Sequence, residues 1–293
     1  MCTAGRPSAS PTEAVDETGS TAREDGKQPA DLGIRVVYSE DACERRPPNH
    51  HDLRLYSCEP SSVCFDADGG TAVARHDIPG VPGAFMLTGL LSRRECALLV
   101  NVAESMGFSP DHPVGQPEPT GIDACEWLVS DALQATIFQR AAPFAPIIRG
   151  CAACGLNARW RFFRYDKGAR YRPHIDGSWV GPGLDASGKY IHDFRGDRRS
   201  RLTFLMYLNE GFQGGNTTFY LPSPDGNGQL EAHGVQPMCG AVLCFPQGNT
   251  ASLVHEGSTV KGGRKYVIRT DMLFLNDPER PNPDAKATSA TSK

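Results

Sequence analysis

The second half of the chain is a succession of short β-rich runs, and this succession limits the fold more than any other feature of the sequence. The runs are ARWRFFRY, YRPHID, RLTFLMYLN, GNTTFYL, GAVLCF, LVHEG and KYVIRTDMLF, all between residues 157 and 275. Gly, Pro, Asn and Asp separate them, as is typical of the turns between antiparallel strands. The pattern predicts an antiparallel double sheet or a barrel.

Two helices are expected before these strands, so the fold class is α+β and mainly β. Ser92 and Glu95 have the spacing of a capping box, which starts an amphipathic helix that we expect to run to about Met106. A second helix is expected over 131–141, because Pro143 follows it. The run GAFMLTGLL is expected to open the domain as a strand.

Both ends of the chain are too polar to build a core. Residues 1–33 contain no aromatic residue, and their only large apolar side chains are Met1, Val15 and Leu32. We expect this segment to be disordered, because it cannot bury enough surface to offset the entropy of ordering it. Residues 279–293 are expected to form a solvated tail.

The part between the two ends divides into an arm and one domain. Residues 34–77 combine the β-like run IRVVY with the turn-rich ERRPPNHHD, and we interpret them as a poorly packed arm against the main domain. Residues 78–278 are expected to form one globular domain.

Charge and composition exclude several classes of function. The chain has 30 Lys and Arg against 34 Asp and Glu, which argues against a bulk electrostatic grip on nucleic acid or on an anionic membrane. No apolar run approaches the ~20 residues of a membrane span, and the first residues lack the apolar block of a secretory signal. Ten cysteines without regular spacing fit a reducing compartment. We therefore expect a protein of the cytoplasm or nucleus.

A candidate metal site lies at the end of one expected strand. His174 and Asp176 are two residues apart, so on a strand their side chains point to the same face. His255, in the run LVHEG, is the best candidate for a third ligand from another strand. Two histidines and one carboxylate on one side of an ion form the facial triad of non-haem Fe(II) oxygenases, which leaves open coordination positions. A His-x-Asp pair alone is more typical of a surface turn.

The wider context supports the metal site. The blocks RYDKGARYRPHIDG, RLTFLMYLNEGFQGGNTTFY, GAVLCFPQG and HEGSTVKGGRKYVIRTD occur in this order. Together they resemble the catalytic domain of the 2-oxoglutarate/Fe(II)-dependent dioxygenases, particularly the prolyl 4-hydroxylase-like branch. The resemblance covers about 160–275, and more loosely 80–275. It implies a double-stranded β-helix of the jelly-roll or cupin type, braced by N-terminal helices.

The resemblance also implies the ligands and cofactors of the site. His174, Asp176 and His255 match the iron ligands of the family. The implied cofactors are Fe(II), 2-oxoglutarate as co-substrate and O₂, with ascorbate as a further reductant. Several alternatives for the site remain open, among them a zinc hydrolase with the same three ligands and a non-catalytic metal-binding barrel.

The family places a cation ten positions past its distal histidine, where it anchors the far carboxylate of 2-oxoglutarate. Here that position is Lys265, with Arg269 as second choice because the two share strand parity. Arg264 faces the other way unless a bulge intervenes. Tyr207 and Tyr165 match family tyrosines that line the co-substrate pocket, although inward aromatic residues on strands are usually core.

The implied reaction is hydroxylation of a C–H bond with release of succinate and CO₂. A peptide or protein side chain, in the first place proline, is the expected substrate. A small molecule or an alkylated base remains an alternative, and the acidic balance disfavours nucleic acid. The sequence does not predict an oligomeric state.

Three further segments are candidates for a functional or a structural role. Residues 177–200 are long for a barrel connection and contain Trp179 and Tyr190, so they are either a lid or substrate wall, or a disordered insertion. The block from Gly214 to Thr217 matches a family motif that we interpret as structural. Cys151 and Cys154 are interpreted as packed thiols, because the chain has no second CxxC pair.

Overall fold

The computed structural model describes residues 32–65, 72–115, 120–226, 228–248 and 253–276. The predicted disorder of residues 1–33 and 279–293 lies outside the described residues except at Leu32 and Gly33. There the prediction is wrong, because Leu32 is buried in the core. The helices are α1 (Arg93–Met106) and α2 (Asp131–Ala141), with a short 3₁₀ helix at Ala142–Phe144. The strands are β1 (Arg35–Glu40), β2 (Leu53–Ser57), β3 (Ala74–Asp77), β4 (Phe85–Thr88), β5 (Ser109–Pro110), β6 (Ile122–Leu128), β7 (Ala153–Leu156), β8 (Arg159–Tyr165), β9 (Tyr171–His174), β10 (Gly183–Leu184), β11 (Tyr190–Ile191), β12 (Arg198–Tyr207), β13 (Gln213–Gly214), β14 (Thr217–Pro222), β15 (Leu230–Val235), β16 (Val242–Pro246), β17 (Val254–Gly257), β18 (Val260–Gly262) and β19 (Lys265–Leu275).

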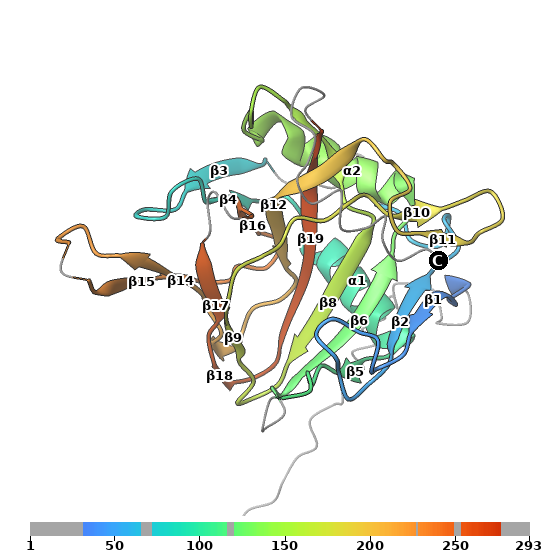
Figure 1. The fold of residues 1–293 in the computed structure, drawn as a ribbon, viewed down its shortest axis with the longest axis horizontal. Coiled ribbons are helices and arrows are strands. Elements are labelled where there is room, and N and C mark those ends of the chain that lie inside the picture. The colour runs from blue at the N-terminus through green and yellow to red at the C-terminus, as the bar shows by residue number, and fades with distance from the viewer. Residues whose placement is uncertain (1–31, 66–71, 116–119, 227, 249–252, 277–293) are drawn as a thin grey trace, which may run out of the picture.

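Eight of these strands form two facing sheets. The smaller sheet has the order β15-β14-β17-β9, and the middle of the large sheet has the order β8-β19-β12-β16. Along the chain the strands alternate between the two sheets except for β14 and β15, which follow each other in the small sheet, and all of the pairings are antiparallel. This is the jelly-roll topology of a double-stranded β-helix, so the predicted fold class is confirmed. In Figure 1, β9 and β17 of the smaller sheet lie beside β8 and β19 of the large sheet.

The two predicted helices are present and lie against the outer face of the large sheet. Ser92 caps α1 with both hydrogen bonds of a capping box, as its spacing with Glu95 predicts. Arg140 of α2 binds the carboxylate of Glu95 through two nitrogens, at 2.8 and 3.0 Å, and both side chains are more than nine-tenths buried. Neither buried charge has water to solvate it, so each depends on the other. Because Glu95 is on α1 and Arg140 is on α2, this ion pair holds the two helices together.

Alternation along β8 separates the core from the site. Trp160 and Phe162 are buried in the layer between the sheet and the helices. Arg159, Arg161 and Tyr165 alternate with them and line a cavity on the opposite face. The inner face of β8 therefore carries polar residues. On an ordinary barrel strand, apolar residues would face the interior and polar residues the solvent.

The chain before residue 78 takes part in the same sheet. Strands β1 and β2 extend it beyond β6, and β2 runs parallel to β6. That pairing is an exception to the all-antiparallel pattern that the sequence predicts. Among the described residues no helix is long and apolar enough to span a membrane.

Candidate metal centre and the cavity beside it

Three donor groups meet at the mouth of the jelly roll. His174 ends β9, His255 lies opposite it on β17, and Asp176 follows two residues after β9. Each group offers one ligand atom, and these atoms all lie within 4.8 Å of one another. The Nε2 atoms of His174 and His255 are 3.5 and 3.6 Å from the two oxygens of Asp176. The structure thus brings together the three residues that the sequence pairs as candidate ligands.

Both imidazoles have the tautomer that a metal site needs. Nδ1 of His174 lies 2.8 Å from the carbonyl of Arg172, and Nδ1 of His255 lies 2.9 Å from that of Leu253. A carbonyl only accepts hydrogen bonds, so each Nδ1 carries a proton and Nε2 is the ring nitrogen that can bind a metal. Burial lowers the pKa of His255 to about 4, so this imidazole is neutral at pH 7.

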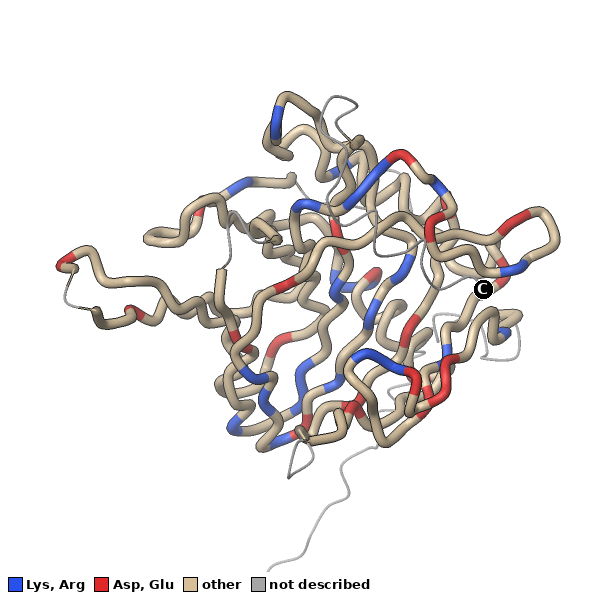
Figure 2. Tube along the Cα trace, viewed as in Figure 1, with Lys and Arg blue, Asp and Glu red and all other residues tan. Residues whose placement is uncertain are grey.

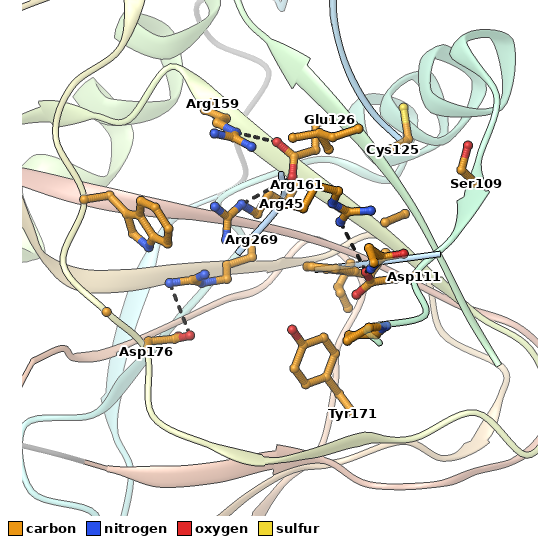
Figure 3. A pocket seen from close by; sticks show the side chains of 18 of the residues that line it. Arg45, Ser109, Asp111, Cys125, Glu126, Arg159, Arg161, Tyr171, Asp176 and Arg269 are labelled. Atoms are coloured by element: carbon orange, nitrogen blue, oxygen red, sulfur yellow. Dashed lines mark hydrogen bonds and ion pairs between the residues drawn. The ribbon is translucent and has the colours of Figure 1, made fainter. Parts of the chain in front are cut away.

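The carboxylate of Asp176 is ionised and held in place. Burial opposes its ionisation, but Arg269 and the two histidines outweigh burial and hold the pKa of this carboxyl well below its usual range. Arg269 Nη2 lies 3.2 Å from its Oδ1, and the hydroxyl of Thr203 donates to its Oδ2 at 2.6 Å. Figure 3 shows Arg269 directed at Asp176 from the wall of the cavity.

A chain of buried hydrogen bonds supports this carboxylate from behind. Gln247 donates to the Thr203 hydroxyl at 2.9 Å and accepts from Ser200 at 2.7 Å. The backbone N–H of Trp179 in turn donates to the Ser200 hydroxyl at 2.8 Å. The connection therefore runs from the 177–200 segment to the candidate ligand, and sequence reasoning did not find it because Thr, Ser and Gln in strands carry no metal signature.

The donor set fits a divalent transition metal. Two imidazoles and one carboxylate are ligands of the borderline kind that Fe(II) accepts, and grouping them on one side leaves coordination positions toward the cavity. The cavity has a volume of about 1040 Å³, and all three donors line it. A site of this kind has room for further ligands beside the ion.

Lys265 lies at the inner end of the same cavity. Its side chain is 2% exposed, and its Nζ donates to the carbonyl of Gly215 at 2.6 Å. Among the described residues it has no carboxylate partner, and burial lowers its pKa to about 7. An ammonium group buried without an opposite charge is costly, unless an anion binds beside it.

Aromatic rings and a glycine turn shape the space around Lys265. Its Nζ lies 5.0 Å from the ring centre of Tyr165 and 5.8 Å from that of Tyr207. The Tyr207 hydroxyl is paired with Thr217 at 2.8 Å. Gly215 adopts φ +69°, and a side chain there would approach the Lys265 stem at 3.2 Å. The Gly214–Thr217 block, predicted to be structural, thus also contacts Lys265 and Tyr207 in this pocket.

The rival cations take other places. Arg264 faces outward and pairs with Asp166, with about half of each side chain exposed. Arg269 shares the inner face of β19 with Lys265, as strand parity predicts, but lies beside Asp176 rather than at the inner end. Figure 2 shows Lys and Arg positions recurring along β8 and β19 in the middle of the large sheet.

Residues 177–200 form an ordered wall of the cavity. They contain the short hairpin β10–β11, and the Tyr190 ring lies 4.9 Å from that of Tyr38 on β1. Trp179 packs against the guanidinium of Arg161, 4.5 Å from its ring centre. Of the two interpretations left open by the sequence, the disordered insertion is therefore wrong, and a role as lid or substrate wall stays a prediction.

Comparisons with known proteins agree with this geometry. Residues 160–270 match the family model of the 2OG-Fe(II) oxygenase superfamily. No curated protein sequence matches the chain.

Among solved structures, three prolyl hydroxylases are similar to the chain. A viral collagen prolyl hydroxylase of Paramecium bursaria Chlorella virus 1 has 18% identity over 71% of this chain and 98% of its own, with a TM-score of 0.40. A Trichoplax adhaerens prolyl hydroxylase bound to a hypoxia inducible factor peptide fragment has 15% identity over 72% and 88%, with a TM-score of 0.45. A Pseudomonas putida prolyl-4-hydroxylase has 17% identity over 72% and 94%, with a TM-score of 0.37.

The family match rests on sequence and is independent of these structures. It begins in β8 and ends in β19, so it spans the jelly roll from its first strand into its last. The donor groups and Lys265 all lie inside the matched segment. Through residues 160–270 the chain is therefore similar to the 2OG-Fe(II) oxygenase superfamily, and this match indicates a dioxygenase.

Proposed function

We propose that the protein hydroxylates a C–H bond with Fe(II), O₂ and 2-oxoglutarate, and that a peptidyl side chain is its substrate. His174, Asp176 and His255 would hold the iron, which when bound supplies O₂ activation coupled to decarboxylation of 2-oxoglutarate. The products would be the hydroxylated substrate, succinate and CO₂.

The observation that carries this proposal is the buried ammonium of Lys265. Both ends of 2-oxoglutarate are carboxylates, so a co-substrate that reached from the metal to the inner end would bring a negative charge to Lys265. Tyr165 and Tyr207 exclude water around that pair, which strengthens it. A zinc hydrolase would have no use for a cation in this position.

The remaining parts of the pocket orient the reactants. The carbonyls of Arg172 and Leu253 fix the imidazoles, and Thr203 fixes the carboxylate. Trp179 and the β10–β11 hairpin enclose the outer cavity, where the substrate would bind.

The choice of substrate follows from sequence resemblance. The similarity to the prolyl 4-hydroxylase-like branch supports a protein side chain, with proline as the first candidate, and a cavity of about 1040 Å³ accommodates a peptide segment. One fold serves many substrates, so the substrate class needs its own test. We also propose that ascorbate sustains turnover by keeping the iron reduced.

The experiment is 2-oxoglutarate turnover followed as succinate release, with and without Fe(II), O₂ and a chelator. We expect turnover only when Fe(II) and O₂ are both present and the chelator is absent. We expect no turnover in His174→Ala or in His255→Ala. His76→Ala is the matched control, because His76 is exposed on β3 and lies outside the cavity. Undiminished turnover in excess chelator, or in either ligand variant, would exclude the proposed function.

A further inference from the structure

A row of charged residues crosses the floor of the outer cavity. Glu126 on β6 is the cross-strand neighbour of Arg161 on β8, which is in turn the neighbour of Arg269 on β19. All three side chains line the cavity. Cross-strand neighbours have Cα atoms about 4.5–5.5 Å apart, so the row begins at the candidate metal centre and leads away from it.

The two ends of the row have partners. Arg269 is paired with Asp176 at 3.2 Å and with Asp271 at 3.4 Å. Glu126 is bound closely by Arg159 through its Oε2. Figure 3 shows Glu126 between Arg159 and Arg161 at the upper side of the cavity.

Arg161, in the middle, is left with a weak partner. Its one ion pair with a described residue is a 3.6 Å approach of Nε to Glu126, whose other oxygen binds Arg159. Its side chain forms no hydrogen bond with any part of the chain that the structure describes. Burial lowers its pKa although Glu126 opposes this, and Trp179 covers one face of its guanidinium at 4.5 Å. A buried guanidinium with one long ion pair has N–H donors left over, and an additional anion could bind them.

The cavity as a whole has an excess of basic side chains. Its lining contains eight Lys and Arg side chains against six Asp and Glu, whereas the whole chain has more acidic than basic residues. An Fe(II) ion and 2-oxoglutarate carry opposite charges of equal size, so their binding leaves this positive excess in place. The excess favours an anionic substrate in the outer cavity.

We propose that the substrate carries a carboxylate that binds Arg161, within about one residue of the carbon that is hydroxylated. The inference rests on the proposed function. The flat fork of the guanidinium, stacked on Trp179, matches a carboxylate in two parallel hydrogen bonds. Glu126 beside it disfavours a doubly charged phosphate. The carboxylate comes either from an acidic residue next to the target residue in a peptide or from the free α-carboxylate of an amino acid.

Matched pairs of probes test this. The peptide probes are capped pentapeptides with a central Pro, Lys or Asn followed by Glu, each paired with its Gln counterpart. The amino-acid probes are free L-proline and L-lysine, each paired with its amide. Binding is measured by calorimetry on protein loaded with Mn(II) and 2-oxoglutarate, and turnover by succinate release with Fe(II).

The variants are Arg161→Gln and Arg161→Lys, with Arg164→Gln as control. Arg164 is on the same strand but pairs with Glu104 and Asp123 outside the cavity. We expect the wild type and the control to bind one class of carboxylate probe ten- to a hundredfold more tightly than its neutral partner. Arg161→Gln should bind both partners equally, and Arg161→Lys should retain part of the preference. The class that responds identifies the source of the carboxylate.

Several outcomes would overturn the inference. One is a wild type that binds no carboxylate probe or does not prefer it to its neutral partner. Another is an Arg161→Gln variant that keeps the preference. The wild-type comparison needs no variant and stands even if Arg161→Gln does not fold. Failure of the proposed function gives a different result, because 2-oxoglutarate would then fail to bind before any probe is added.

Discussion

Lys265 is the residue whose position is hardest to explain without a ligand. It is a cation with 2% exposure, between two aromatic rings, and the one hydrogen bond of its ammonium group to a described residue goes to a backbone carbonyl. Burying an ammonium costs several kcal/mol, and in the empty protein no carboxylate of the described residues offsets that cost. Such a residue is retained for function at the expense of stability.

Replacing Lys265 by Met should therefore stabilise the empty protein. Met has a similar volume and no charge, so we expect a gain of about 1–4 kcal/mol at pH 6. Burial lowers the pKa of Lys265 to about 7, against ~10.4 in the unfolded chain. The penalty is present in full below pH 7 and disappears as the pH rises toward the unfolded value, so the gain should shrink toward pH 10. Urea unfolding at both pH values measures this, and a less stable Met variant at pH 6 would contradict it.

The same group should make 2-oxoglutarate binding depend on pH. Only the protonated ammonium pairs with a carboxylate, and in the empty site Lys265 loses its proton above about pH 7. The rings that face it belong to Tyr165 and Tyr207, and burial raises the pKa of both, so neither phenol becomes charged in this range. Affinity should fall between pH 7 and 9, by at most tenfold per pH unit. Calorimetric titration should show this slope in the wild type and none in Lys265→Arg; an equal slope in both would place the titration elsewhere.

At the level of elements, the sequence predicts where most helices and strands lie, but it does not predict which strands pair with each other. The capping box at Ser92, the helix over 131–141 and the seven runs after residue 157 all correspond to observed elements. The strand at Ile122–Leu128 was missed, because its sequence IDACEWL mixes charged and apolar residues on a face that turns out to line the cavity. The His-x-Asp pair could be predicted from its spacing, although the strand ends at His174 and Asp176 lies two residues beyond it. Arg161 could not, because its importance depends on where Glu126 and Trp179 lie in three dimensions.

The β10–β11 hairpin should control substrate binding more than metal chemistry. It lines the outer cavity through Tyr190, which packs against Tyr38. Replacing residues 183–191 by two glycines should lower substrate-coupled turnover at least tenfold and leave 2-oxoglutarate binding within about twofold. Replacing only the tip, 185–189, by Asn-Gly keeps the paired strands and is the matched control. Loss of 2-oxoglutarate binding in the hairpin variant alone would show that it supports the barrel instead.

At the level of the whole molecule, one jelly roll holds the two functional ends of the pocket in fixed relation. The small sheet supplies both histidines and the large sheet supplies Lys265. Pairing with β9 places His255 beside His174 in the small sheet, and pairing with β8 places Lys265 beside Tyr165 in the large sheet. The cavity between them is a consequence of topology, so the ligand residues could be predicted from motifs while the shape of the substrate site could not.

The division of the chain into an N-terminal segment, an arm and a domain stays a prediction, and a truncation tests it. The deletion should end at residue 31, because Leu32 is 4% exposed in the core and its carbonyl accepts from the backbone N–H of Glu59. We expect a chain starting at Leu32 to keep its Tm within about 2 °C and its turnover within twofold, since surface changes alter stability by less than about 0.5 kcal/mol. Starting at residue 58 removes β1 and β2 and should cost much more. Equal effects of the two deletions would contradict this division.

The most direct test of the central claim is an anaerobic titration of the protein with Fe(II) and then with 2-oxoglutarate, followed by visible absorption. We expect a weak charge-transfer band in the wild type, saturating with one co-substrate per iron, and no band in His174→Ala or His255→Ala. In Lys265→Ala the same band should need at least a hundredfold more 2-oxoglutarate, because removing one partner of a buried ion pair costs about 3–5 kcal/mol. A wild type without the band, or a Lys265→Ala variant that saturates at the wild-type concentration, would contradict the account.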